Sequence, residues 1–207
     1  MSQLGLEGSI CQIEKAAVIS DCGRFRYELT RVWDKGGPLL VTCMLNPSTA
    51  DADNDDPTIR ALIDFGRVWS YGGLLVVNLF AFRSSSPIVM MSWHDPRGPK
   101  NAQFIDAALT LARSQNTPVL AAWGANGAHH TNVNDWEDGQ DWFCARARRQ
   151  CVDLICLGLT KDGFPKHPMA RGLHRIARNQ QPVMFRPARK AASQHWCTNR
   201  GFFGRSL

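Results

Sequence analysis

The sequence has no apolar run that approaches the roughly 20 residues needed to cross a bilayer. Its first ten residues, MSQLGLEGSI, contain neither a basic start nor an apolar stretch, which argues against a secretory leader. Its seven cysteines form no Cys-x-x-Cys pair, and no histidine lies at zinc-ligand spacing. We therefore expect a soluble, cytoplasmic protein with reduced thiols, without a disulfide framework, a structural zinc or a membrane partner.

Several common catalytic motifs are also absent. The chain has no Gly-x-Ser-x-Gly elbow, no glycine-rich phosphate loop ending in Gly-Lys-Ser/Thr, and no dinucleotide fingerprint. These absences disfavour serine hydrolases, P-loop enzymes and Rossmann dehydrogenases. They leave catalysis by a positioned water, without a cofactor, or no catalysis.

Acidic side chains are missing from the last part of the chain. Residues 171–207 contain eight Lys or Arg and no Asp or Glu, whereas residues 1–170 contain 16 basic and 18 acidic side chains, a net charge of −2. The overall charge of +6 is thus a property of the C-terminal segment, which suits a nucleic-acid backbone or is simply solvated. The candidate nucleic-acid-binding residues are Arg171, Arg175, Arg178, Arg186, Arg189 and Lys190.

A chain of 207 residues with 44% hydrophobic side chains is long enough for one sizeable core. Four apolar runs bounded by turn signals, PLLVTCMLN, GGLLVVNLFAF, TPVLAAWG and CVDLICLGL, predict strands buried on both faces. Amphipathic segments predict helices over 57–69, 99–113 and 136–149, and RFRYELTRVW predicts an edge strand. This order predicts a three-layer α/β sandwich with a central, mostly parallel four-stranded sheet.

We place that single α/β domain, with its N-terminal edge strand or hairpin, in residues 1–170. Residues 171–207 are then a basic C-terminal extension, disordered in part.

Polar or glycine-containing segments follow all four predicted core strands. Because the carboxyl ends of parallel strands meet at one edge of a sheet, these segments should form one ligand site. The candidate substrate-binding residues are Pro47, Ser48, Asn78, Trp123, Gly124 and Lys161.

Two residues in these segments have side chains suited to catalysis. Asn46 precedes a proline, which favours an extended backbone and a rigid turn, so its amide could orient a water or read a base edge. His167 lies near Lys161 and Lys166, which should lower its pKa and leave a neutral donor. The alternatives are a turn-forming asparagine and a surface histidine without a role.

The stretch MLNPSTADADNDDPT carries four aspartates within six residues. A calcium loop would need Gly and Glu where this chain has Asp56 and Leu62, so that interpretation fails. We predict no metal, with a magnesium site at Asp51, Asp55 and Asp56 as the alternative. Helix capping is the stronger interpretation, with Asp56 at the N-cap and Pro57 at the first helical position. Asp51, nearest to the predicted pocket, is the third catalytic candidate beside Asn46 and His167.

Five blocks together resemble a bacterial and phage family called domain of unknown function 1643, over about residues 22–171. They are FRYELTRVW, MLNPSTADADNDDPTIR, YGGLLVVNLFAFRSSSP, WG and LGLTKDGFPKHPM. The layout also resembles the mismatch-specific branch of the uracil-DNA glycosylase superfamily. Asn46-Pro47-Ser48 is similar to its Asn-Pro-Gly loop, Trp123-Gly124 to its Trp-Gly, and His167-Pro168 to the start of its His-Pro-Ser-Pro loop.

The glycosylase resemblance implies specific roles. Asn46 would position the attacking water, Asn78 would read a flipped base, and His167 would stabilise the departing base. The leading hypothesis is therefore an enzyme that hydrolyses an N-glycosidic bond in DNA or in a modified nucleotide. The alternatives are a non-catalytic nucleic-acid-binding module and a magnesium-dependent phosphohydrolase that uses the aspartates.

Overall fold

The computed structural model describes residues 12–129 and 139–188. Within these residues the chain forms a mixed seven-stranded sheet in the order β1-β2-β4-β3-β5-β6-β7. The four central strands β4, β3, β5 and β6 are mutually parallel, and the outer strands are antiparallel to their neighbours. The strands are β1 (Glu14–Ile19), β2 (Arg26–Val32), β3 (Leu39–Met44), β4 (Gly73–Asn78), β5 (Val119–Ala121), β6 (Leu154–Cys156) and β7 (Val183–Arg186).

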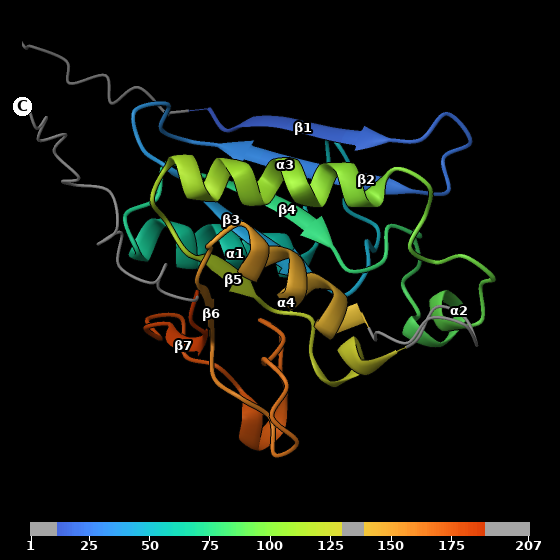
Figure 1. Cartoon of the computed structure of the whole chain (residues 1–207). Helices are drawn as coiled ribbons and strands as arrows, with labels where there is room; N and C mark the ends of the chain where they lie inside the picture. Colours follow the sequence, from blue (N-terminus) through green and yellow to red (C-terminus); the bar gives the residue numbers. More distant parts are fainter. Residues whose placement is uncertain (1–11, 130–138, 189–207) are drawn as a thin grey trace, which may run out of the picture.

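Helices cover both faces of the sheet, with α3 and α4 on one face and α1 on the other (Figure 1). The short helix α2 follows the carboxyl end of β4. Within the described ranges, no helix has the length and apolar character needed to cross a membrane. The helices are α1 (Pro57–Val68), α2 (Pro87–Met91), α3 (Asn101–Ser114) and α4 (Gly139–Arg149), with 3-10 turns η1 (Ala125–Ala128) and η2 (Gly172–His174).

The predicted α/β architecture, with a partly parallel core between helical layers, is confirmed. The sheet is larger than the predicted one. RFRYELTRVW is not an edge strand, because β2 pairs with β1 on one side and with β4 on the other, so β1 takes the edge. β7 extends the sheet beyond residue 170, where the predicted domain ends. This strand is held to the domain because Phe185 is buried and packs edge-on against Trp123, with ring centroids 5.8 Å apart.

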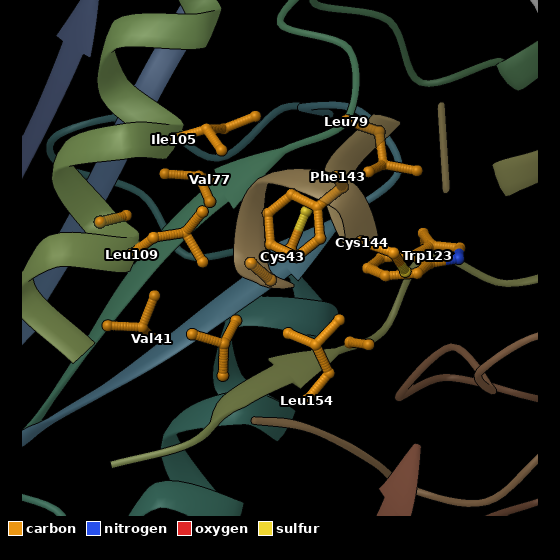
Figure 2. Close-up of a cluster of buried hydrophobic side chains, with 14 of the residues drawn as sticks. Val41, Cys43, Val77, Leu79, Ile105, Leu109, Trp123, Phe143, Cys144 and Leu154 are labelled. Carbon is orange, nitrogen blue, oxygen red and sulfur yellow. The ribbon is translucent and has the colours of Figure 1, made fainter. Parts of the chain in front are cut away.

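The larger apolar cluster lies between the sheet and helices α3 and α4 (Figure 2). Val41 and Val77 from the central strands pack there against Ile105 of α3 and Phe143 of α4. Cys43 lies in the same cluster, and burial raises the pKa of its thiol well above the ordinary value. The Cys43 thiol is therefore a packing group in the core.

A β-bulge in β2 brings two arginines to the same face of the sheet. The register passes from Val18 opposite Glu28 to Ile19 opposite Arg26, so Tyr27 is the extra residue. Arg26 and Arg31 lie five positions apart and would point to opposite faces of a regular strand. With the bulge, both reach the segment 50–55 that precedes α1.

Arg31 is the centre of the contacts that hold this acidic segment. Its side chain is fully buried, and its Nε donates to Asp55 Oδ1 at 2.6 Å. Nη2 donates to the main-chain oxygen of Asp51 at 2.6 Å, and Nη1 donates to that of Thr30 at 2.8 Å. Lys15 of β1 approaches the second Asp55 oxygen at 3.2 Å. The aspartate run is thus neutralised in part by cations from β1 and β2.

We predict that Arg31→Met lowers the free energy of unfolding by about 3 kcal/mol. The variant leaves two main-chain oxygens without their donor and a partly buried carboxylate with Lys15 as its remaining cation. Chemical denaturation measures this effect. Lys35→Met is the matched control, since the ion pair of Lys35 with Glu14 is exposed and should contribute little to stability. Equal losses in the two variants would contradict a central role for Arg31.

Candidate functional site

The strand order places a ligand crevice beyond the carboxyl ends of β3 and β5. From β3 the chain passes through α1 to β4 on one side, and it then returns through α3 to β5 on the other side. Such a switch point leaves a crevice between the two diverging connections. A cavity of about 600 Å³ lies there, within the size range of small-molecule sites. Its polar and charged lining includes Asn46, Ser48, Thr49, Asp56, Thr58, Ser84, Ser85, Asn126, His167 and Arg171.

Asn46 is held in one orientation by two main-chain oxygens. Its Nδ2 donates to Ser84 O at 2.7 Å and to Pro47 O at 3.0 Å. Because both partners are carbonyl oxygens, the amide nitrogen must face them, and Oδ1 remains as an acceptor for a ligand. The Ser84 N–H also donates to Pro47 O, which ties the segments after β3 and β4 together.

His167 is a half-buried side chain on the cavity wall. Burial lowers its pKa, while the nearby Asp56 carboxylate acts in the opposite direction. Its Nδ1 accepts a hydrogen bond from the Met169 N–H at 3.1 Å. The neutral ring therefore carries its proton on Nε2, the donor that it can offer to a ligand. The predicted direction of the pKa shift is right, but its main cause is burial rather than neighbouring lysines.

The Trp123–Gly124 pair joins the ends of β5 and β6. The Gly124 N–H donates to Pro165 O at 3.0 Å, which brings the segment containing His167 against the end of β5. Gly124 has φ 76° and ψ −171°, a conformation that is almost exclusive to glycine. Trp123 is 1% exposed, and its indole Nε1 donates to Gln140 Oε1 at 3.1 Å. The sequence predicted both residues at the site, and both line the cavity.

Asp56 serves as the N-cap of α1 and also lines the cavity. Its Oδ1 accepts hydrogen bonds from the main-chain N–H groups of Thr58 at 2.8 Å and Ile59 at 2.9 Å, and Pro57 follows at the first helical position, as predicted. Burial lowers the pKa of nearby Arg26 to about 10, although the Asp56 carboxylate raises it, so Arg26 is cationic at neutral pH. The carboxylate thus lies between a buried cation, a helix N-terminus and His167.

Asp51 and Asp55 are engaged outside the cavity. Asp51 Oδ1 accepts hydrogen bonds from the main-chain N–H groups of Asn54 and Asp53, which lower the pKa of Asp51. Asp55 is paired with Arg31. In the part of the chain that the structure describes, no three His, Cys, Asp or Glu side chains gather as metal ligands. The magnesium alternative at Asp51, Asp55 and Asp56 thus has no ligand cluster to support it.

Three predicted substrate-binding residues lie away from the cavity lining. Pro47 is buried beneath it, and Lys161 is exposed in the loop after β6. Asn78 is fully buried at the end of β4, and within residues 12–129 and 139–188 neither of its amide atoms has a hydrogen-bond partner. Asn101 of α3 donates instead to the main-chain oxygen of Asn78 at 2.9 Å. A base-reading role for Asn78 therefore requires a rearrangement that opens this part of the core.

The six predicted nucleic-acid-binding residues separate into groups. Arg171 lines the cavity, and Arg175 and Arg178 lie beside it. Arg186 lies on β7, with its guanidinium 4.5 Å from the ring of Phe185. The remaining two, Arg189 and Lys190, lie outside the described residues.

Several residues that line the cavity were not predicted from the sequence. Ser84 and Ser85 lie in the loop between β4 and α2, and Asn126 belongs to the 3-10 turn after β5. Each lies five to seven residues after the end of β4 or β5, so the rule that identified Asn46 could have been extended to them. Asp56 was assigned only to capping or metal binding, because the sequence does not show that α1 begins at the cavity wall.

Comparison with protein families shows to which family the chain belongs. A family described as "Protein of unknown function (DUF1643)" matches residues 26–169. The chain belongs to this family. That confirms the family resemblance noted in the sequence, and the match ends two residues after His167. No curated protein and no solved structure matches the chain, and nothing in these comparisons links the family to the uracil-DNA glycosylases.

The lowered pKa of His167 predicts a loss of stability in acid. Because the folded state holds this group below its ordinary value of about 6.5, the unfolded state takes up a proton first as the pH falls. Stabilisation is complete above pH 6.5 and declines below it, by at most about 1.4 kcal/mol per pH unit. Denaturation between pH 7 and 5 should show a smaller slope for His167→Gln than for the wild type. His174→Gln, on an exposed turn, is the control and should retain the wild-type slope.

Proposed function

We propose that the cavity binds a nucleobase on its sugar and hydrolyses the N-glycosidic bond, in DNA or in a modified nucleotide. One observation carries this proposal: an amide oxygen, a neutral imidazole donor and a carboxylate, from Asn46, His167 and Asp56, line one cavity at the switch point of the sheet. The three groups arise from the ends of β3 and β6 and from the start of α1.

The chemistry needs an oriented water and a stabilised leaving group. In the proposed reaction, Asn46 Oδ1 accepts a hydrogen bond from the water, whose oxygen forms a bond to the anomeric carbon. The bond from that carbon to the base nitrogen breaks, and the electron pair leaves with the base. A hydrogen bond from His167 Nε2–H stabilises the charge that develops on the base. Asp56 accepts the proton of the water and attracts the positive charge on the sugar.

The glycosylase resemblance supports this assignment through the order of its motifs. Asn46-Pro47-Ser48, Trp123-Gly124 and His167 each contribute to the cavity or its floor. The chain departs from the resemblance where Met169 and Ala170 replace Ser-Pro and where the aspartate run follows the first motif. The aspartate run has a local structural role, because Asp55 binds Arg31 and Asp56 caps α1.

A non-catalytic nucleic-acid-binding module is the second candidate. The arginines beside the cavity favour it, because they would bind a backbone whether or not a bond is broken. The two functions differ in whether a product forms.

The direct test incubates the protein with DNA containing uracil, a thymine mismatch or a hypermodified base, and measures abasic sites. We expect product with at least one substrate, and a loss of roughly 100-fold in Asn46→Ala and in His167→Gln. Gln103→Ala, on the exposed face of α3, is the control and should retain full activity. Absence of product with every substrate, together with binding of the same DNA, would favour the binding module.

Asp56 offers a test that separates capping from chemistry. Asn is as good an N-cap as Asp, so Asp56→Asn should retain the unfolding free energy within about 0.5 kcal/mol, whereas Asp56→Ala should lose about 1 kcal/mol. If the carboxylate acts in the reaction, both variants lose activity to a similar extent. Full activity in Asp56→Asn would restrict Asp56 to its structural role.

A further inference from the structure

A second cavity adjoins the first and is lined by arginines. It has a volume of about 440 Å³ and is formed by residues 168–172 and 175–178, in the connection between β6 and β7. Met169 and Arg171 line both cavities, so the two are neighbours that share one wall. We call Arg171, Arg175 and Arg178 the arginine shelf.

The arginine shelf carries charge that the fold does not neutralise. Within the described residues, no acidic side chain pairs with Arg171 or Arg175. Arg178 has only a distant acid, with Nη1 3.9 Å from Asp64 Oδ2, and both side chains of that pair are about half exposed. No acidic residue lines the second cavity. Three guanidinium groups in a concave surface without carboxylates form a site for an anion with several oxygens.

Contacts with α1 fix the position of the arginine shelf. Trp69 Nε1, at the end of α1, donates to Gln180 O at 3.0 Å. Ile176 packs against the apolar cluster on this face of the sheet, and the Arg178 guanidinium lies 6.0 Å from the centre of the Phe65 ring. The segment is therefore held against the domain.

We infer that the arginine shelf is a phosphate subsite for the ligand whose base occupies the first cavity. This inference rests on the proposed nucleobase site and deepens it, because it assigns a phosphorylated substrate rather than a free nucleoside. Arg171, in the shared wall, contacts the phosphate nearest to the base. Arg175 and Arg178 contact further phosphate oxygens, and their planar forks suit phosphate groups. A nucleic-acid strand and a nucleotide with a terminal phosphate share this chemistry.

The test compares two double variants that lose the same charge. Arg175→Gln/Arg178→Gln removes two shelf residues. Arg148→Gln/Arg149→Gln removes two exposed arginines from the last turn of α4, which leads to the amino end of β6, whereas the arginine shelf follows the carboxyl end of β6. The probe is a fluorescein-labelled single strand of 12 nucleotides containing all four bases, and its anisotropy is measured from 50 to 200 mM salt. Equimolar mixtures of the four deoxynucleosides, or of their 5′-monophosphates, serve as competitors.

We expect the shelf variant to bind the strand at least about tenfold more weakly than the wild type, with a salt slope lower by about 1.4, because each phosphate contact on a single strand contributes about 0.7. The α4 variant should change affinity by less than about twofold. If the monophosphates compete less well for the shelf variant than for the wild type, the shelf binds a terminal phosphate. If only the affinity for the strand falls, the shelf binds the backbone.

Two outcomes would overturn the inference. One is an equal loss of strand affinity in the two double variants, and the other is that the shelf variant loses competition by the nucleosides as much as competition by the monophosphates.

The anisotropy assay and the abasic-site assay together separate this inference from the proposed reaction. Asn46→Ala should lose product formation but keep the wild-type salt slope. If product forms and the two double variants bind the strand equally well, the phosphate subsite is rejected and the hydrolysis is retained. A shelf effect without product from any substrate would keep the phosphate subsite and reject the hydrolysis.

Discussion

The buried guanidinium of Arg31 is the constraint on which the arrangement of the site depends. It binds the Asp55 carboxylate and main-chain oxygens from two segments, so the acidic run is fixed against β2 before α1 begins. A buried ion is costly unless its donors are satisfied, and here several acceptors are supplied by residues that would otherwise repel one another. The helix therefore starts at a defined point, with Asp56 beside the cavity.

The cavity is consequently assembled from segments that hold one another in place. Asn46 is oriented by Ser84, His167 is oriented by the Met169 N–H, and Gly124 joins the end of β5 to the segment that precedes His167. Each of these contacts uses a main-chain partner, so the polar groups are aligned without depending on other flexible side chains. Such preorganisation is what a reaction that develops charge requires.

Much of the fold could be predicted from the sequence, because the four apolar core strands and the stripe of α1 are strong local signals. The bulge at Tyr27 could not, since alternation alone places Arg26 and Arg31 on opposite faces. Asn46, Trp123, Gly124 and His167 were found from strand ends, whereas the burial of Asn78 depends on α3 packing over the end of β4. Local patterns predict which strand end a residue follows, but tertiary packing decides its exposure.

The antiparallel strand β7 links the edge of the sheet to the arginine shelf. It covers the edge of β6, which would otherwise present unpaired main-chain groups to other molecules. The arginine shelf lies in the connection that delivers this strand, and Phe185 on the strand packs against Trp123 at the cavity. Removing this segment would therefore expose an adhesive sheet edge as well as remove positive charge. The pairing of the β6 edge and the position of the arginine shelf depend on the same short stretch of chain, so a change in that stretch affects both.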